Sequence, residues 1–156
     1  MLNPFKKKGD PVFSPVSGRI IPLDEVPDPV FAGRSVGDGF AVAPTDGSFR
    51  SPADGELVLV AKTLHAFAIR TDAGAELLVH IGIDTVKLKG EGFTGHRQAG
   101  ERVSRGDLII SCDLAELAAK VPSMATPVIL TNGSKFGMTD PDLQAADTPV
   151  ITVRRK

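Results

Sequence analysis

Glycine and proline interrupt this chain so frequently that long helices do not fit between them. Sixteen glycines and twelve prolines are spread along 156 residues, and both residue types disfavour helix interiors and favour turns. The apolar runs between them are short and rich in branched side chains, which is typical of the strands of a β-sandwich or barrel. We therefore predict an all-β, antiparallel sandwich or barrel with one or two short helices.

Several apolar runs are candidate strands, and one segment is a candidate helix. Asp113 is placed to cap this helix, Glu116 occupies the capping-box position, and Pro122 ends it. The polar segment Gly133–Thr148 is predicted to be a loop or frayed connection. The candidate strands are Val12–Phe13, Gly18–Pro22, Gly39–Ala43, Gly55–Ala61, His65–Arg70, Glu76–Ile83, Asp107–Cys112, Thr126–Leu130 and Pro149–Val153.

The length predicts one domain, with residues 1–10 as a flexible tail and residues 11–156 as the folded part. The net charge is −1 and no long run of Lys or Arg occurs, so a nucleic-acid partner is not expected. The Lys6–Lys8 cluster would give at most weak membrane-surface contact. No apolar run approaches the roughly 20 residues of a membrane span, and no signal peptide is evident. Together with the single Cys112, these features predict a cytoplasmic protein.

Two of the three histidines lie in apolar runs that predict strands. A four-residue loop, Thr71–Gly74, would pair Arg70 with Ala75 in a hairpin. Counted outward along both strands, this register places His65 opposite His80 on one face, with their Cβ atoms about 5 Å apart. A change of one residue in the loop would make the pair diagonal or move it to opposite faces.

Three explanations compete for such a pair: an inert pair in the core, two ligands of a zinc ion, and nucleophilic catalysis or phosphoryl carriage. The third is favoured, because a histidine with a pKa near ~6.5 is mostly neutral at cytoplasmic pH and has a free lone pair. His65 would donate a hydrogen bond to a phosphoryl group on His80, and Thr63 would fix the tautomer of His65. Gly82 would leave room for an anion.

The segment "LLVHIGIDTVKLKGEGF" closely resembles the signature of the glucose-family enzyme IIA domain of the bacterial phosphoenolpyruvate-dependent sugar phosphotransferase system. Further matching segments are "PVSGRIIPLDEVPDPVFA", "VGDGFAV", "PADGEL", "HAFAI" and "GERVSRGDLI". The resemblance covers almost the whole chain, roughly Val12 to Val153. It implies a fold of the double-hybrid-motif type.

The resemblance also implies a function. His80 would accept a phosphoryl group on Nε2 from phosphohistidine of the carrier protein HPr and pass it to a cysteine of a sugar-specific IIB domain. His65 would contact the phosphoryl group and support onward transfer, and Thr63 would bond to His65. Regulatory target proteins are further partners that the family suggests.

Acidic and apolar residues around the site would bind the partners. By the resemblance, Asp28 and Asp84 flank the site and meet a basic residue on HPr. An apolar collar is expected around so shallow a site. Its candidate residues are Val30, Phe31, Val36, Leu78 and Val86.

Two other classes of function are weighed. Lysostaphin-type zinc endopeptidases share a related β architecture, but they need an HxH pair, which this sequence lacks. The second class is a regulatory binding module whose phosphorylation state is recognised by target proteins. This role would be added to phosphoryl carriage and does not exclude it. No cofactor is required, although His65 and His80 are candidate ligands for a zinc ion shared with a partner. At Pro29, Ala61 and Leu64 the chain departs from the family pattern, which leaves partner identity open.

Overall fold

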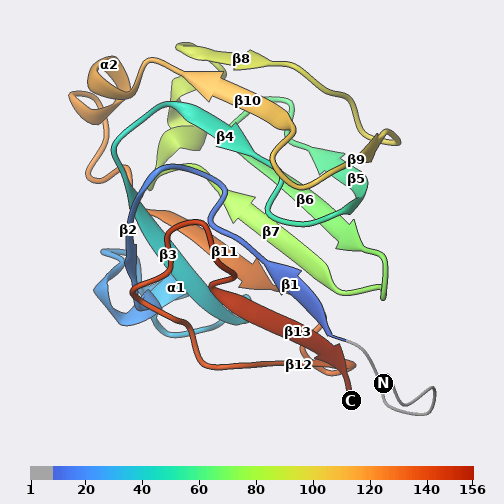
Figure 1. The fold of residues 1–156 in the computed structure, drawn as a ribbon. Coiled ribbons are helices and arrows are strands. Elements are labelled where there is room, and N and C mark those ends of the chain that lie inside the picture. Colours follow the sequence, from blue (N-terminus) through green and yellow to red (C-terminus); the bar gives the residue numbers. More distant parts are fainter. Residues whose placement is uncertain (1–8) are drawn as a thin grey trace.

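The computed structural model describes residues 9–156 (Figure 1). Residues 1–8, which include the Lys6–Lys8 cluster of the predicted tail, lie outside the described residues. No helix in the part of the chain that the structure describes has the length and apolar character needed to cross a membrane.

A seven-stranded sheet forms the centre of the molecule, and its strand pairs are antiparallel. It is open, with β2 and β9 at its edges. Its strands, in spatial order, are β2 (Gly18–Ile21), β3 (Asp38–Pro44), β11 (Thr126–Leu130), β7 (Glu76–His80), β6 (Ala66–Thr71), β5 (Gly55–Val60) and β9 (Arg102–Val103).

Two small antiparallel sheets and four short helical segments complete the fold. Figure 1 shows one small sheet at the top of the view and the other at the bottom, near the C-terminus. The sheets are β4 (Ser48–Arg50), β10 (Leu108–Cys112) and β8 (Phe93–Gly95), and β1 (Asp10–Val12), β13 (Ile151–Arg155) and β12 (Phe136–Met138). The helices are α1 (Pro29–Ala32) and α2 (Leu114–Ala118), with 3₁₀ turns η1 (Leu23–Glu25) and η2 (Thr85–Leu88). The predicted all-β fold with one or two short helices is confirmed.

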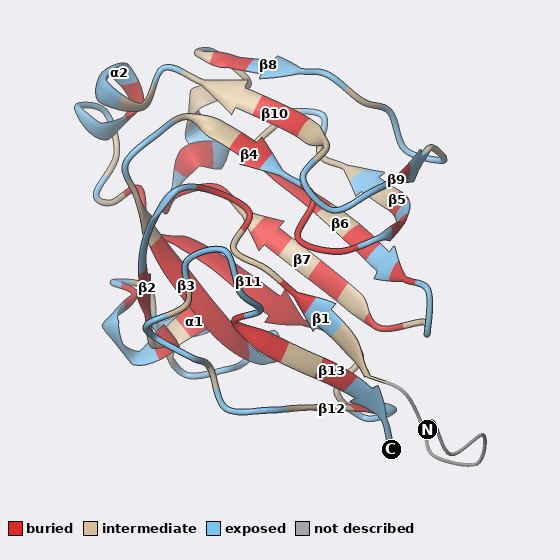
Figure 2. Ribbon diagram, in the orientation of Figure 1, coloured by how far each residue is buried: buried red, intermediate tan, exposed pale blue. Residues whose placement is uncertain are grey.

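Side-chain alternation divides the central sheet into two faces. Leu77 and Val79 of β7 are fully buried and point to an inner face that packs into the main core. Leu78 and His80 point to the opposite side, which we call the outer face, because successive residues of a strand alternate. In Figure 2 the buried residues are concentrated in β3 and β11, whereas buried and intermediate residues alternate along β7.

A second, smaller apolar cluster lies on the outer face. Leu23, Val26 and Phe31, from the segment that contains η1 and α1, pack against Ile129 of β11, with Leu78 at the edge of the cluster. This packing holds α1 against the outer face beside the end of β7. The remainder of the outer face, across β7, β6 and β5, is not covered by these helical turns.

The candidate helix is confirmed as α2, and its cap is the predicted one. Asp113 accepts a hydrogen bond from the backbone N–H of Glu116 at 3.1 Å. The helix ends at Ala118, before Pro122 is reached. The prediction of a loop over Gly133–Thr148 is wrong in part, because β12 lies inside this segment, pairs with β13 and buries Phe136.

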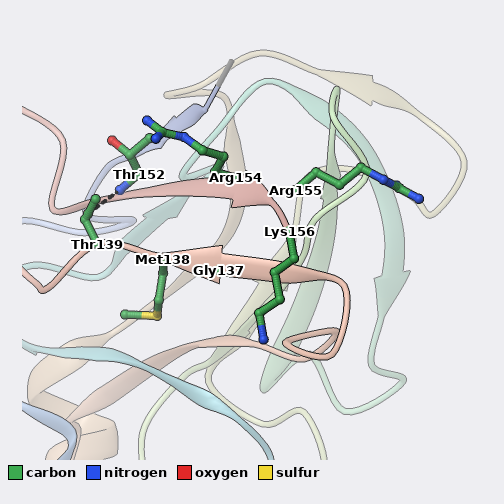
Figure 3. Close-up of a pocket in the computed structure, with 7 residues that line it drawn as sticks. All are labelled: Gly137, Met138, Thr139, Thr152, Arg154, Arg155 and Lys156. Carbon is green, nitrogen blue, oxygen red and sulfur yellow. Dashed lines mark hydrogen bonds between the residues drawn. The ribbon is translucent and has the colours of Figure 1, made fainter. Parts of the chain in front are cut away.

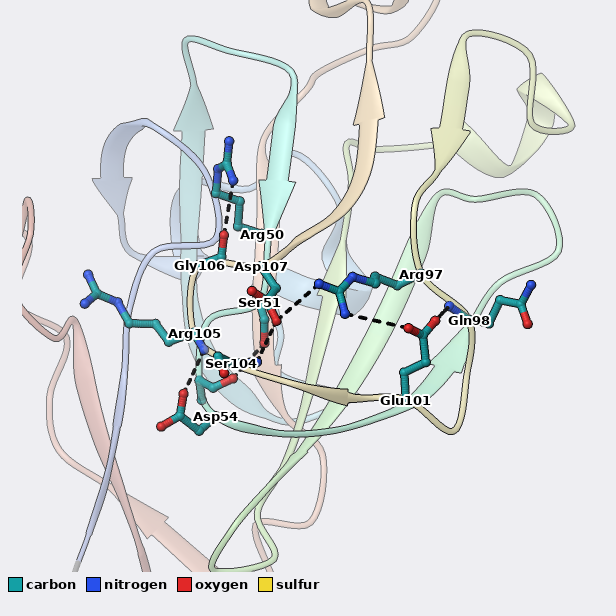
Figure 4. Close-up of polar contacts among 11 residues, drawn as sticks. Arg50, Ser51, Asp54, Arg97, Gln98, Glu101, Ser104, Arg105, Gly106 and Asp107 are labelled. Atoms are coloured by element: carbon teal, nitrogen blue, oxygen red, sulfur yellow. Dashed lines mark hydrogen bonds and ion pairs between the residues drawn. The ribbon is translucent and has the colours of Figure 1, made fainter.

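The connection before β10 is held by a surface network of charges (Figure 4). Arg97 lies 3.6 Å from Glu101 and 3.5 Å from Asp107, and Asp107 also accepts a hydrogen bond from the backbone N–H of Ser104. The backbone N–H of Ser51 donates to the carbonyl of Asp107. Each exposed ion pair is worth at most about 1 kcal/mol, so the network orders the loop and adds little to overall stability.

Candidate functional site

The hairpin of β6 and β7 does not have the predicted register. Ala66, and not His65, lies opposite His80, and Arg70 lies opposite Glu76. The turn is one residue longer than predicted, because Thr71 closes it through two hydrogen bonds. Its backbone N–H donates to the carbonyl of Ala75 at 2.8 Å, and its hydroxyl accepts from the N–H of Ala75 at 3.1 Å.

The two imidazoles are nevertheless adjacent. A shift of one residue would place His65 on the inner face if β6 continued through it, but β6 begins at Ala66. His65 lies in a preceding turn in which Leu64 adopts a left-handed conformation, with φ of 59°. Its carbonyl accepts a hydrogen bond from the N–H of Ile81 at 2.7 Å. The turn brings the ring of His65 within 5.1 Å of the ring of His80, centroid to centroid, in an edge-to-face arrangement.

One hydrogen bond fixes the tautomer of His80. Its Nδ1 lies 2.7 Å from the carbonyl oxygen of Gly82. A carbonyl oxygen only accepts hydrogen bonds, so Nδ1 carries the proton and the neutral ring has its lone pair on Nε2. Gly82 has a φ of +71°, and a Cβ there would lie 2.7 Å from Cγ2 of Thr85. The position therefore requires glycine to present its carbonyl to the ring.

Thr63 holds the other imidazole. Its hydroxyl oxygen lies 2.5 Å from Nδ1 of His65. When the hydroxyl donates to Nδ1, the neutral ring carries its proton on Nε2 and can donate it to an anion. No hydrogen bond to Nε2 of His65 or His80 is found within residues 9–156. One ring thus offers a lone pair, and the other a donor.

Burial keeps both rings neutral. The pKa of His80 is lowered from 6.5 chiefly by burial, and the Gly82 carbonyl and the charges of Asp28 and Asp84 offset part of this effect. The pKa of His65 is lowered by burial and by the nearby charge that His80 would carry when protonated. A neutral imidazole is the nucleophilic form, so both directions favour reaction at neutral pH.

We expect nucleophilic reactivity at His80 to persist below pH 6.5. Because its pKa is lowered from 6.5, the neutral form is still dominant at a pH where a free histidine is already half protonated. Phosphorylation by phosphoramidate, a small donor, should be followed from about pH 5 to 8, with N-acetylhistidine as the reference. The midpoint of the rate should lie at lower pH for the protein than for the reference. A midpoint at or above that of the reference would contradict the expected direction.

The predicted acidic residues lie in the two turns that flank His80. Asp28 is the N-cap of α1 and accepts a hydrogen bond from the N–H of Val30 at 2.9 Å. Asp84 precedes η2 in a left-handed conformation, and its carboxylate lies 3.7 Å from Nζ of Lys87. Both charges raise the pKa of His80 against the effect of burial, so both act on the ring electrostatically.

The predicted collar residues differ in exposure. Val30, Val36 and Val86 are exposed, with 48%, 36% and 49% of their surface accessible. Leu78 is half-buried on the outer face. Phe31 is buried, and its ring centroid lies 4.9 Å from that of His80, so it packs behind the imidazole. The three valines are thus available to a partner, whereas the buried ring of Phe31 packs against the imidazole of His80.

Within residues 9–156, no group of three or more His, Cys, Asp or Glu side chains is arranged to hold a metal ion. His65 and His80 supply two imidazoles, which is half of a tetrahedral zinc shell. The two imidazoles leave the remaining positions of such a shell to ligands from outside this pair, such as water or a partner.

A surface pocket of about 300 Å³ lies elsewhere, between β12 and β13. Thr139 and Thr152 are joined there by a hydrogen bond of 2.9 Å. The side chains of Arg154 and Arg155 point to opposite sides of the strand (Figure 3). The basic groups do not converge on one point, and the pocket contains none of the predicted site residues.

Comparison with known proteins identifies the class to which this fold and site belong. The family model described as "phosphoenolpyruvate-dependent sugar phosphotransferase system, EIIA 1" matches residues 10–136. The chain therefore belongs to this EIIA family, as the sequence predicts, and is a phosphotransferase-system protein with a transferase role in sugar uptake.

Named relatives and a solved structure agree with the family. The "PTS system glucose-specific EIIA component" of Halalkalibacterium halodurans is 40% identical over 92% of this chain and 85% of that protein. Its counterpart in Oceanobacillus iheyensis is 50% identical over 78% and 73%. A "mannose-specific EIIBCA component" of Corynebacterium glutamicum is 43% identical over 93% of this chain but only 22% of that protein. The glucose permease IIA of Mycoplasma capricolum has a TM-score of 0.86 at 40% identity, covering 98% of this chain and 99% of that one.

Proposed function

We propose that this chain is a phosphoryl carrier that uses His80 Nε2 to move a phosphoryl group between two proteins. It accepts the group from phosphohistidine of HPr and donates it to a cysteine of a IIB domain, in the cytoplasm. The observation that supports the proposal most directly is the hydrogen bond from His80 Nδ1 to the Gly82 carbonyl. This bond leaves the lone pair on Nε2, beside a second imidazole that can donate to the transferred group.

The transfer requires little covalent chemistry from the protein. The Nε2 lone pair of His80 attacks phosphorus, an N–P bond forms, and the bond from phosphorus to the donor's nitrogen breaks, returning its electron pair to the donor imidazole. Charge is spread over the three equatorial oxygens in the loose transition state. His65 Nε2–H is placed to stabilise that charge, and Nδ1–H of His80 bonds to Gly82 while the ring gains positive character. In the onward step a thiolate of the acceptor attacks the same phosphorus, an S–P bond forms, and the N–P bond to His80 breaks, returning its electron pair to Nε2.

The names of relatives support the choice of acceptor and of first test sugar. The Corynebacterium relative is named as an EIIBCA component, so that protein combines an EIIA with an EIIB part. The two EIIA relatives and the structural neighbour carry glucose in their names. We take a IIB domain as the acceptor and glucose as the first sugar to test.

Two further roles belong to the same proposal. Regulatory proteins that bind the outer face would distinguish phosphorylated from unphosphorylated His80, because the phosphoryl group adds nearly two negative charges at neutral pH. A partner that presents a carboxylate to His65 and His80 would complete a zinc shell between the two proteins.

The proposal is tested by reconstitution. The purified chain is incubated with enzyme I, HPr and phosphoenolpyruvate, and its intact mass is followed before and after a IIB domain is added. We expect one phosphate that is labile in acid and stable in alkali, and that is lost when the IIB domain and sugar are present. A chain that acquires no phosphate would refute carriage itself, and a phosphate that never leaves would refute the acceptor.

A further inference from the structure

The outer face of β5, β6 and β7 is organised in cross-strand rows. Directly opposed residues of neighbouring strands point to the same face, so the register defines which side chains lie side by side. Along β7, from Glu76 toward His80, a charged row comes first, then an apolar row, then the row that contains His80. The rows are Glu56–Arg70–Glu76, then Leu59–Ala68–Leu78, then Ala66–His80.

A β-bulge gives Leu59 its place in the apolar row. Leu57 lies opposite Ile69 and Leu59 lies opposite Ala68, so Val58 is an extra residue in β5. In a regular strand, Leu59 would point to the same face as Leu57, which is fully buried in the core. The bulge turns Leu59 to the outer face instead, where 48% of its surface is exposed.

Leu59 extends the apolar surface beyond the small cluster under α1. Neither of the two hydrophobic clusters in the described part of the chain includes Leu59, whereas Leu78 packs at the edge of the outer one. A single exposed leucine is ordinary. Leu59, however, lies two strands from Leu78 in a continuous row, and the residue between them is the small Ala68, which leaves both leucines accessible.

The position of Leu59 falls inside any protein interface centred on His80. Neighbouring strands are about 4.8 Å apart and residues two apart along a strand about 6.7 Å, which places Leu59 roughly 12 Å from His80. A standard interface covers roughly 800 Å² on each partner, a disc of about 16 Å radius. Continuity with the proposed transfer site is therefore the reason to expect a protein over Leu59.

The neighbouring row indicates the charge of that protein. Arg70 is paired with Glu76 at 3.3 Å. Arg102, which lies opposite Glu56 on β9, is paired with Asp72, and the carboxylate of Glu56 forms no ion pair with any residue of the 9–156 range. A surface that buries Leu59 would bring its own polar groups next to Glu56, and a Lys or Arg there would match its charge.

We propose that Leu59 is a docking residue for the phosphohistidine donor protein, whose complementary surface is apolar opposite Leu59 and cationic opposite Glu56. This inference rests on the proposed function and names a contact of the same site. Neither Leu59 nor Glu56 is among the predicted collar residues. The bulge therefore has a functional consequence: it moves one leucine from the core to the docking face.

The test uses the steady-state rate of His80 phosphorylation at varied concentrations of phosphorylated HPr. For Leu59→Lys we expect the KM for the donor protein to rise about tenfold, and for Leu59→Ala about threefold, with kcat within about twofold. Glu56→Lys should raise KM in the same direction by charge repulsion. The matched control is Leu143→Lys, which changes a leucine of similar exposure, 43%, in the connection between β12 and β13. We expect it to leave KM unchanged.

Phosphoramidate separates the possible failures. This small donor needs no docking surface, so it should phosphorylate the wild type and each Leu59 variant at the same rate. If it phosphorylates all of them and KM for the donor protein is unchanged in Leu59→Lys, the docking role is wrong. If only transfer to the IIB domain is slowed, the occupant is the acceptor and the assignment to the donor is wrong. If the wild type itself is not phosphorylated by either donor, it is the proposed function that fails.

Discussion

We expect His80→Ala to reduce phosphorylation of the chain by HPr by on the order of 10⁴-fold or more, while the fold is retained. Removing the nucleophile removes the atom that forms the bond to phosphorus, and losses of this size are typical of such changes. His65 does not replace His80, because its Nδ1 is engaged by Thr63 and its ring lies 5.1 Å from the nucleophile, centroid to centroid. The measurement is intact mass after incubation with enzyme I, HPr and phosphoenolpyruvate.

The chain offers a matched control for this change. His96 is exposed and bonds to Ser111 at 2.8 Å, on the sheet of β8 and β10. His96→Ala should leave both the phosphate and its rate unchanged, and circular dichroism should show that both variants are folded. Phosphate that is retained in His80→Ala would show that the nucleophile has been wrongly assigned.

The second large effect is expected for His65→Gln, which separates the two halves of the reaction. The variant keeps the His80 nucleophile and its tautomer, since the bond to Gly82 is untouched, so it should still accept a phosphoryl group from HPr, although more slowly than the wild type. It loses the imidazole N–H that stabilises the group while a thiolate attacks. Donation to a IIB domain should fall by about 10²-fold or more, as is usual when a positioned proton donor is removed.

The two steps are measured separately by single turnover. The chain is first phosphorylated and isolated, and its loss of phosphate is then followed after a IIB domain is added. Thr63→Val is the graded comparison, because it removes only the hydroxyl that holds Nδ1 of His65, and it should slow donation less than His65→Gln. Normal donation by His65→Gln would exclude the supporting role of this ring.

Much of the fold is readable from local patterns. A short apolar run, Leu77–Val79, indicates β7, and the Asp113 cap indicates α2, because both signals come from neighbours in sequence. Helix α1 has four residues and too little periodicity to detect, although its cap, Asp28, lies in the quoted "VPDP". Strand β12 has only three residues, Phe136–Met138, inside a longer polar segment, and only its pairing with β13 identifies it.

The sequence identifies the residues of the candidate site but does not predict the backbone geometry that brings them together. The hairpin count gave the wrong register, since a side chain, Thr71, extends the turn by one residue. The observed register would place the two histidines on opposite faces if β6 continued through His65, but the left-handed conformation of Leu64 turns His65 toward His80. Neither effect has a signal in strand periodicity. The bulge at Val58 also has no signal in the sequence. In the run "LVLV", Leu57–Val60, every residue is apolar, so the pattern does not indicate which side chains point to the core.

The Gly82 carbonyl has a consequence for the product as well as for the nucleophile. The Nδ1–H of His80 is hydrogen-bonded to the Gly82 carbonyl. The ring cannot react at Nδ1, or flip so that its two nitrogens exchange places, without breaking this hydrogen bond. Every turnover should therefore yield the same positional isomer of phosphohistidine, recognisable as a single phosphorus resonance. If the proposed function is right, the carbonyl of one glycine sets which imidazole nitrogen carries the phosphoryl group.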